Sequence, residues 1–216
     1  MEYKQIVEHR KNRADTIAKA GGINEAITSG VVDEYVDLTL SEAIVLGLLR
    51  QGVKKYVGIF GHGSTEIGEV LRVYEEAGLI KAYYVRHEVE AAHAATALRW
   101  VTGEKAAVFS SIGPGALQAM AGSLSASSNG IGVWHIYGDE TTEDEGPNMQ
   151  QIPGNRQGKY LRLCQDMGNA YSLHTPGAVG TALRRGLNTV DHPYKAGPFY
   201  LLLPMNTQSS LIGCFN

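Results

Sequence analysis

Three short segments of the sequence combine glycine with side chains that can do chemistry. They are 61–64 (GHGS), 86–88 (RHE) and 110–115 (SSIGPG). Each follows a short apolar run and precedes a segment with helical character. This order is typical of open α/β sheets, in which ligands bind at the carboxyl ends of the strands. The three segments are therefore the candidate site.

The segment 61–64, called the glycine loop below, lacks the features of a phosphate loop. It has neither the GxGxxG spacing nor the lysine that reaches phosphate groups in nucleotide-binding proteins. A nucleotide site is therefore disfavoured. Taken alone, the segment can equally be a turn with one glycine at positive φ.

Glu88 is the first residue of an alanine-rich segment. Its simplest role is a negative charge at a helix N-terminus, where the helix dipole favours it. The next turns carry Ala91, Ala92, Ala94 and Ala95, and such small residues predict close packing that partly buries Glu88. A partly buried carboxylate can share a proton with a ligand nitrogen. Glu88 is therefore a candidate functional residue.

In the third segment, Gly113 and Gly115 flank Pro114. Two glycines around a proline let the backbone pass close to a flat ligand, because no side chain stands in the way. An ordinary tight turn fits these three residues equally well when they are taken alone.

Short apolar strands alternate with helices along most of the chain. We expect strands at 56–60, 82–85, 106–110, 131–137 and 199–203, and helices at 40–49, 66–74, 88–101, 116–125 and 176–190. Thr39 and Glu42 form a capping-box pattern before the first of these helices. An acidic loop is expected at 139–148, and 150–172 is ambiguous. The alternation predicts an α/β fold, with an open parallel sheet of about six strands and helices on both faces.

The chain divides into three parts. We expect an N-terminal helical arm (1–37), one α/β domain (38–206) and a C-terminal tail (207–216). The arm is polar and lacks a full apolar stripe, so we expect it to pack on the surface of the domain or on a neighbouring molecule.

Composition and charge disfavour several classes of function. The sequence has 19 lysine and arginine residues against 22 aspartate and glutamate residues, a net charge of −3, which offers no basic surface for nucleic acid or membrane. The charged N-terminal segment is not a secretory signal, and the uncharged stretch 106–138 is broken by six glycines, so it is not a membrane span. Cys164 and Cys214 form no CxxC pair, which favours a cytoplasmic protein.

The ordered set of segments resembles the pyrimidine-binding domain of thiamine-diphosphate enzymes of the acetolactate-synthase type. Within that family it is most similar to the trihydroxycyclohexane-dione hydrolases of inositol catabolism. The likeness extends over about 38–206. The segments that carry it are IFGHG (59–63), HE and AAHAA (87–95), SIGPGA (111–116), MQQ (149–151) and KAGPF (195–199).

The resemblance implies roles for the carboxylate and the proline turn. Glu88 matches the glutamate that hydrogen-bonds the aminopyrimidine ring of thiamine diphosphate and so activates the cofactor. Pro114 is expected to lie against that ring, with Gly113 and Gly115 allowing the close approach. Gln118 stands where the synthases usually carry asparagine, and it joins the expected cofactor-binding set.

The resemblance also places the glycine loop near the reacting centre. Gly61, His62, Gly63 and Ser64 are expected to face the thiazolium ring and a small carbonyl substrate, with Gly61 touching the cofactor. His62 is then a candidate acid, base or oxyanion contact. Gln150 matches a family glutamine close to the same centre. The expected catalytic residues are thus Glu88, His62 and Gln150.

Enzymes of this family bind the diphosphate through Mg²⁺ in a second domain marked by Gly-Asp-Gly. This sequence has no such segment, and its histidines have no metal-ligand spacing. We therefore expect no metal site on this chain, and a separate partner chain that holds Mg²⁺ and the diphosphate. Self-association is also expected, because pyrimidine-binding domains of the family lie near a dimer axis.

The expected function is that of one subunit of a split thiamine-diphosphate enzyme that makes or breaks a carbon–carbon bond next to a carbonyl. The reaction stays open among cleavage of a cyclic dione, decarboxylation of a 2-oxoacid and an acetolactate-like ligation. The main alternative is a non-catalytic binding or regulatory module with the same fold. A generic nucleotide-binding domain is a third and weaker reading.

Overall fold

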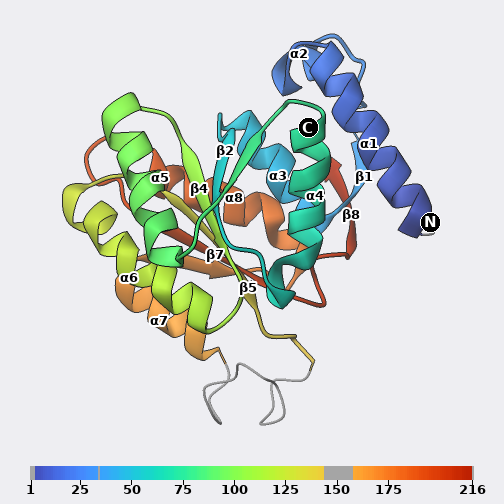
Figure 1. The fold of residues 1–216 in the computed structure, drawn as a ribbon. Helices are drawn as coiled ribbons and strands as arrows, with labels where there is room; N and C mark the ends of the chain where they lie inside the picture. The colour runs from blue at the N-terminus through green and yellow to red at the C-terminus, as the bar shows by residue number, and fades with distance from the viewer. Residues whose placement is uncertain (1–2, 34, 144–157, 216) are drawn as a thin grey trace.

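The computed structural model describes residues 3–33, 35–143 and 158–215 (Figure 1). The described strands are β1 (Tyr35–Thr39), β2 (Lys55–Gly58), β3 (Lys81–Tyr84), β4 (Ala106–Ser110), β5 (Trp134–Asp139), β6 (Asn169–Ser172), β7 (Phe199–Pro204) and β8 (Leu211–Phe215). The described α-helices are α1 (Tyr3–Lys19), α2 (Ile23–Thr28), α3 (Leu40–Arg50), α4 (Thr65–Glu76), α5 (Glu88–Thr102), α6 (Pro114–Asn129), α7 (Lys159–Met167) and α8 (Val179–Val190). Two short 3₁₀ turns are η1 (His62–Ser64) and η2 (Pro176–Ala178).

Six of the described strands form one parallel sheet, in the order β3-β2-β4-β5-β7-β6. In the register of its central strands, Lys55 of β2 pairs with Ala106 of β4, and Trp134 of β5 pairs with Phe199 of β7. All residues of β4, β5 and β7 are buried, as is usual for parallel strands that are covered on both faces. The predicted open parallel sheet of about six strands is confirmed.

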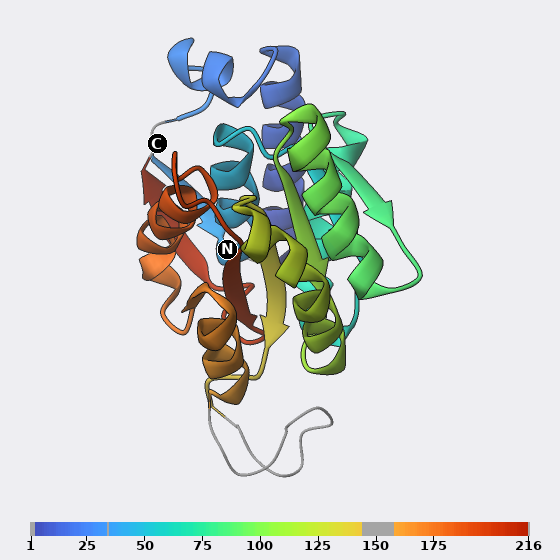
Figure 2. The ribbon, with the colours of Figure 1, turned by 90° about the vertical axis from the view of Figure 1, so that its left-hand side faces the viewer.

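The sheet separates two hydrophobic cores. Successive strand residues point to opposite faces, so Phe109 and Leu201 enter one core, whereas Val108 and Leu202 enter the other. The first core is covered by α3, α4 and α8, with α1 and α2 packed outside them, and the second by α5, α6 and α7 (Figures 1 and 2). Helices on both faces were predicted and are confirmed.

Close packing between α5 and α6 fixes the helix that begins at Glu88. A Cβ built on Gly122 of α6 would lie 2.8 Å from the Cβ of Ala92 and 2.8 Å from the carbonyl oxygen of Val89. Glycine and alanine therefore let the two backbones come closer than larger side chains would allow. This contact holds the start of α5 beside the start of α6.

The arm helix α1 is bound to the domain through a buried ionic cluster. Arg10 is fully buried, and its Nη2 lies 2.7 Å from Oε1 of Glu66 and donates to Oγ1 of Thr39 at 3.1 Å. Its Nε lies 3.5 Å from Oε2 of Glu42, an ion pair without a hydrogen bond. Arg13 Nη1 donates to the other oxygen of Glu42 at 2.5 Å. The arm thus bridges the starts of α3 and α4.

This cluster also corrects one detail of the capping-box prediction. Thr39 is the N-cap of α3, and its Oγ1 accepts from the backbone amide of Glu42 at 3.3 Å, as predicted. The predicted return contact from the Glu42 carboxylate to the Thr39 amide is wrong. That carboxylate instead pairs with the two arginines of the arm, because ion pairing offsets the cost of burying its charge.

A second, two-stranded sheet joins residues from both ends of the chain. β1 pairs with β8 in antiparallel register, with Thr39 opposite Leu211. The residues of β8 belong to the predicted C-terminal tail, and the first residues of β1 belong to the predicted arm. The two segments therefore form one element of structure, and α3 begins directly from it.

His135 lies in β5 and has no access to solvent. Its Nδ1 is 2.8 Å from the hydroxyl of Tyr137, and its ring packs against Tyr200 at 5.2 Å between centroids. Its Nε2 has no hydrogen-bond partner in the part of the chain that the structure describes. Burial lowers the pKa of His135 to about 3, because the charged ring would lose its hydration.

This pKa predicts a specific loss of stability in acid. Below about pH 6.5 the unfolded chain protonates His135, whereas the folded chain does so only near pH 3. The free energy of unfolding therefore falls by up to about 1.4 kcal/mol per pH unit as the pH drops from 6.5 towards 3. Urea unfolding of His135→Gln between pH 7 and pH 4 should show a shallower decline than wild type. The exposed His174→Gln should decline like wild type, and parallel curves for all three proteins would contradict the prediction.

Candidate functional site

Three loops meet at one edge of the sheet. The glycine loop follows β2, the turn leading to Glu88 follows β3, and the turn at 111–113 follows β4. Strand β2 lies between β3 and β4, and parallel strands end at the same edge, so their loops are neighbours. The fold therefore brings together the three segments that the sequence indicated (Figure 1).

The backbone of the glycine loop packs closely against the side chains of the turn at 111–113. The amide of Gly63 donates to Oγ of Ser111 at 3.3 Å. A Cβ built on Gly61 would lie 2.6 Å from that Oγ, and a Cβ built on Gly63 would lie 2.9 Å from Cγ2 of Ile112. Glycine is thus required at both positions, because any side chain would collide with the neighbouring loop.

Residues that follow β7 hold the same loop from the other side. The buried Gln208 donates from Nε2 to the carbonyl oxygen of Gly63 at 2.7 Å and to that of Leu203 at 3.1 Å. A Cβ built on Gly138, in β5, would collide with the Gly63 carbonyl oxygen. Sequence reasoning gave Gln208 no role, since only the fold brings it to a residue 145 positions earlier.

Within the glycine loop, His62 and Ser64 have different surroundings. Ser64 is buried, and its hydroxyl accepts from the Gly61 amide at 3.1 Å and donates to the Gly61 carbonyl at 3.2 Å. This hydroxyl therefore closes the turn. The side chain of His62 is exposed, so its imidazole is the group of this loop that can meet a ligand.

Glu88 begins α5, and its side chain is half-buried. Its carboxylate has no hydrogen bond or ion pair with any residue that the structure describes. A Cβ built on Gly115 would lie 2.8 Å from Oε1 of Glu88 and 2.6 Å from Oγ of Ser110. The space that a side chain at position 115 would fill is thus bordered by a carboxylate and a hydroxyl.

The start of α6 presents the predicted proline turn. Gly113 is the N-cap at φ 70°, which favours glycine, and Pro114 is the first helical residue, where proline's fixed φ suits a helix. Pro114 and Gln118, one turn later, are both exposed. Both side chains are accessible at the end of α6 that adjoins Glu88.

Two buried acids at the end of β5 were missed by the sequence interpretation, which placed them in an acidic loop. Asp139 and Glu140 are only 7% and 6% exposed. Asp139 accepts from Oγ of Ser172 at 3.3 Å and from the amide of Glu140 at 3.0 Å. Burial, reinforced by the charges of these two acids, raises the pKa of Tyr160. The signal in the sequence is that only Gly138 separates Asp139 from the apolar run 131–137.

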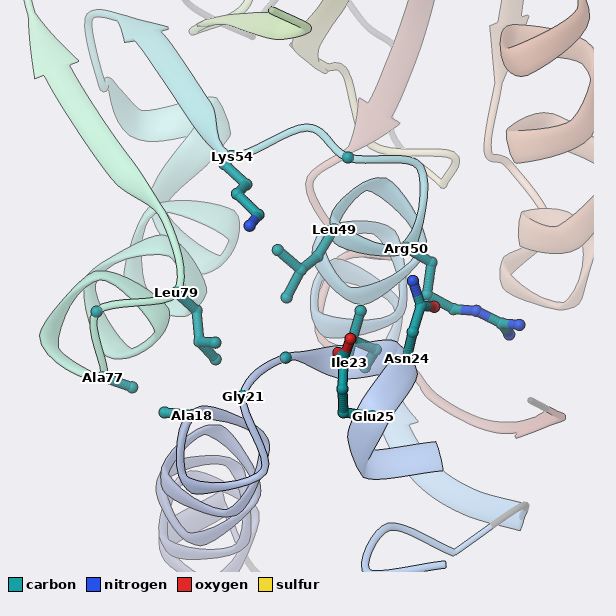
Figure 3. Close-up of a pocket in the computed structure, with 13 residues that line it drawn as sticks. Ala18, Gly21, Ile23, Asn24, Glu25, Leu49, Arg50, Lys54, Ala77 and Leu79 are labelled. Atoms are coloured by element: carbon teal, nitrogen blue, oxygen red, sulfur yellow. The ribbon is translucent and has the colours of Figure 1, made fainter. Parts of the chain in front are cut away.

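A separate pocket of about 510 Å³ lies at the opposite edge of the sheet (Figure 3). It is enclosed by the ends of α1, α3 and α4 and by the turn that begins α2. The side chains of Leu49, Lys54 and Leu79 point into it. None of the site residues predicted from the sequence lines this pocket.

Three further points concern the predicted residue Gln150, metal ligands and membrane-spanning helices. Gln150 lies outside the described residues. Within the described ranges, no three His, Cys, Asp or Glu side chains are grouped so as to hold a metal ion. In the same part of the chain, no helix has the length and apolar character needed to cross a membrane.

Comparison with protein families identifies the family to which this part of the chain is similar. The family described as "Thiamine pyrophosphate enzyme, N-terminal TPP binding domain" matches residues 38–158, a range that contains all three loops. The chain belongs to the thiamine pyrophosphate enzyme family. Thiamine pyrophosphate is the cofactor that is also called thiamine diphosphate, so the resemblance drawn from the motifs is confirmed.

The relatives of this thiamine pyrophosphate enzyme family member are much longer proteins. The acetolactate synthase large subunit of Pyropia yezoensis is 38% identical over 96 residues, which cover 44% of this chain and 16% of that protein. The 3D-(3,5/4)-trihydroxycyclohexane-1,2-dione hydrolases of Bacillus thuringiensis and Bacillus cereus are 30% identical over 195 residues, covering 81% of this chain and 30% of each relative. The chain thus spans less than a third of the length of these relatives.

The residues at the loop edge fit the cofactor that this family binds. A flat ring with hydrogen-bonding nitrogens needs a narrow approach and a partner for those nitrogens. The carboxylate of Glu88 has no partner among the described residues and can provide the hydrogen bond, and glycine at 115 places no side chain over it. The exposed Pro114 provides an apolar surface next to them.

Proposed function

We propose that this chain supplies the pyrimidine-binding half of a thiamine diphosphate-dependent active site. The observation that carries the proposal is the carboxylate of Glu88, which is half-buried beside Gly115 and has no partner among the described residues. When bound, the cofactor supplies the carbanion chemistry that attacks a substrate carbonyl. The task of Glu88 is to exchange a proton with a nitrogen of the pyrimidine ring.

The neighbouring residues complete this half-site in the proposal. Gly113, Pro114 and Gly115 provide the surface on which the ring lies, and Gln118 contacts its edge. The exposed imidazole of His62 is positioned to donate or accept a proton at the substrate carbonyl. The glycine loop supplies backbone groups beside it, and Gln150 is assigned to the same centre from the family resemblance alone.

We propose cleavage of a carbon–carbon bond in a cyclic dione as the reaction. The support is the relatives named dione hydrolases, whose likeness covers 81% of this chain, whereas the likeness to the acetolactate synthase subunit covers 44%. Decarboxylation of a 2-oxoacid and acetolactate-like ligation use the same half-site, so a substrate screen must include all three classes.

We propose further that a diphosphate-binding domain on a partner chain holds Mg²⁺ and completes the site. Support comes from the described residues, which offer no group of ligands for a metal ion. Exposed apolar side chains on α5 and α6, among them Trp100, Val101 and Leu124, suit association with a partner or a second copy. We assign the assembled enzyme to the cytoplasm.

Calorimetry on the purified chain tests whether the cofactor site needs a second chain that binds the diphosphate. Without a partner, we expect no binding of thiamine diphosphate at micromolar concentrations, even with Mg²⁺, because diphosphate recognition depends on the metal and on backbone donors. Adding a diphosphate-binding chain should produce binding and turnover. Micromolar binding to the chain alone, or turnover of a dione or 2-oxoacid by it, would overturn the split-site proposal. An assembled complex that binds the cofactor but converts no substrate would indicate a regulatory module instead.

A further inference from the structure

Ser110, the last residue of β4, has an unexplained hydroxyl. The residue is fully buried, and its Oγ has no hydrogen-bond partner in the part of the chain that the structure describes. Nearly all buried polar groups in proteins are hydrogen-bonded, because an orphaned group has lost its water without compensation. The hydroxyl of Ser110 is therefore available to a group that comes next to it.

At Gly115, the hydroxyl of Ser110 and the carboxylate of Glu88 border the same point. Ser110 Oγ and Glu88 Oε1 lie 2.6 Å and 2.8 Å from the single point where a Cβ on Gly115 would be. The distance between the two oxygen atoms is therefore at most the sum of these two distances. With glycine at 115, no side chain separates the two oxygen atoms.

The adjacent serine shows that the two hydroxyls have different tasks. Ser111 Oγ accepts from the amide of Gly63 and so ties the turn to the glycine loop. Ser110 Oγ faces the other way, towards Gly115 and the start of α5. Ser111 therefore makes the hydrogen bond that holds this turn, and the hydroxyl of Ser110 remains available to Glu88.

We propose that Ser110 is a positioning residue for Glu88. When Glu88 turns one carboxylate oxygen towards a nitrogen of the pyrimidine ring, the hydroxyl of Ser110 donates a hydrogen bond to the other oxygen. A hydroxyl-to-carboxylate hydrogen bond is short and directional. It fixes the plane of the carboxylate and leaves a single oxygen to share the proton with the ring. This inference rests on the proposed function of Glu88.

The test compares Ser110→Ala with the matched variant Ser127→Ala, whose serine is exposed on α6. The first measurement is deuterium exchange at C2 of thiamine diphosphate bound to the assembled complex. Losing a hydrogen bond to a charged group should slow this exchange about tenfold in Ser110→Ala, with little change in cofactor affinity. Ser127→Ala should exchange like wild type.

The second measurement needs no cofactor. Because the hydroxyl of Ser110 has no partner in the chain itself, its removal should leave the urea midpoint unchanged or raise it. A lower midpoint, or normal exchange in a complex where Glu88→Gln is slow, would overturn the role of Ser110 and leave the proposed function standing. Normal exchange in Glu88→Gln itself would instead overturn the proposed function.

Discussion

Replacing Arg10 by methionine is expected to lower the free energy of unfolding by about 3 kcal/mol. The guanidinium is fully buried between Glu42, Glu66 and Thr39. Methionine fills much of the same volume but leaves the buried carboxylate of Glu42 with Arg13 as its remaining ionic partner. Removing one member of a buried ionic cluster is costly, because a charge then stays in the interior without full compensation.

Equilibrium unfolding in urea measures this effect, and Arg72→Met provides the control. Arg72 also pairs with two carboxylates, Glu69 and Glu76, but its side chain is 51% exposed. Its loss should cost no more than about 1 kcal/mol, since solvent screens exposed ion pairs. Equal losses in the two variants would show that the arm is not held by its buried arginine.

Replacing Glu88 by glutamine is expected to slow C2 deuterium exchange of bound thiamine diphosphate by at least about 100-fold. An amide has the shape of the carboxylate but cannot take up and return a proton to the pyrimidine ring. Proton magnetic resonance of the assembled complex in deuterium oxide measures the exchange directly. The unfolding midpoint should stay close to wild type, because the carboxylate has no partner among the described residues to lose.

Glu90→Gln is the matched control for this variant. Glu90 lies in the same first turn of α5, is exposed, and accepts from the backbone amide of Arg86 at 3.3 Å. It should exchange at the wild-type rate. If Glu88→Gln exchanged as fast as Glu90→Gln, proton transfer by Glu88 would have to be abandoned.

The sheet and its loops were predictable because their signals are local. Apolar runs such as 106–110 end in glycine-rich turns, so each strand and the loop after it can be identified from adjacent residues. The region 150–172 gave no such signal, and it contributes α7 and the edge strand β6 within its described part. An edge strand buries less apolar surface, so its sequence carries a weaker pattern. No residue of β6 is fully buried.

The contacts that escaped sequence reasoning join residues far apart in the chain. Arg10 is separated by 56 positions from Glu66, and no periodic pattern indicates which arginine will be buried against which acid. The relation between Gly115 and Glu88 was missed for the same reason. Glycine was expected there to admit a ligand, and in the structure the space beside it borders the catalytic carboxylate proposed for this site.

The contacts around Gly61 and Gly63 have a consequence for engineering. A chimera whose new 61–64 segment carried side chains at positions 61 and 63 would place atoms against Ser111 and Ile112, where no room exists for a side chain. The glycine loop is therefore not a modular unit that can be exchanged by itself. The transferable unit comprises that loop together with the turn at 111–113, and with Gln208, which holds the loop from behind. Within this unit His62 is the position with an exposed side chain in the loop's 3₁₀ turn, and it is where a designer can vary chemistry without disturbing the fold.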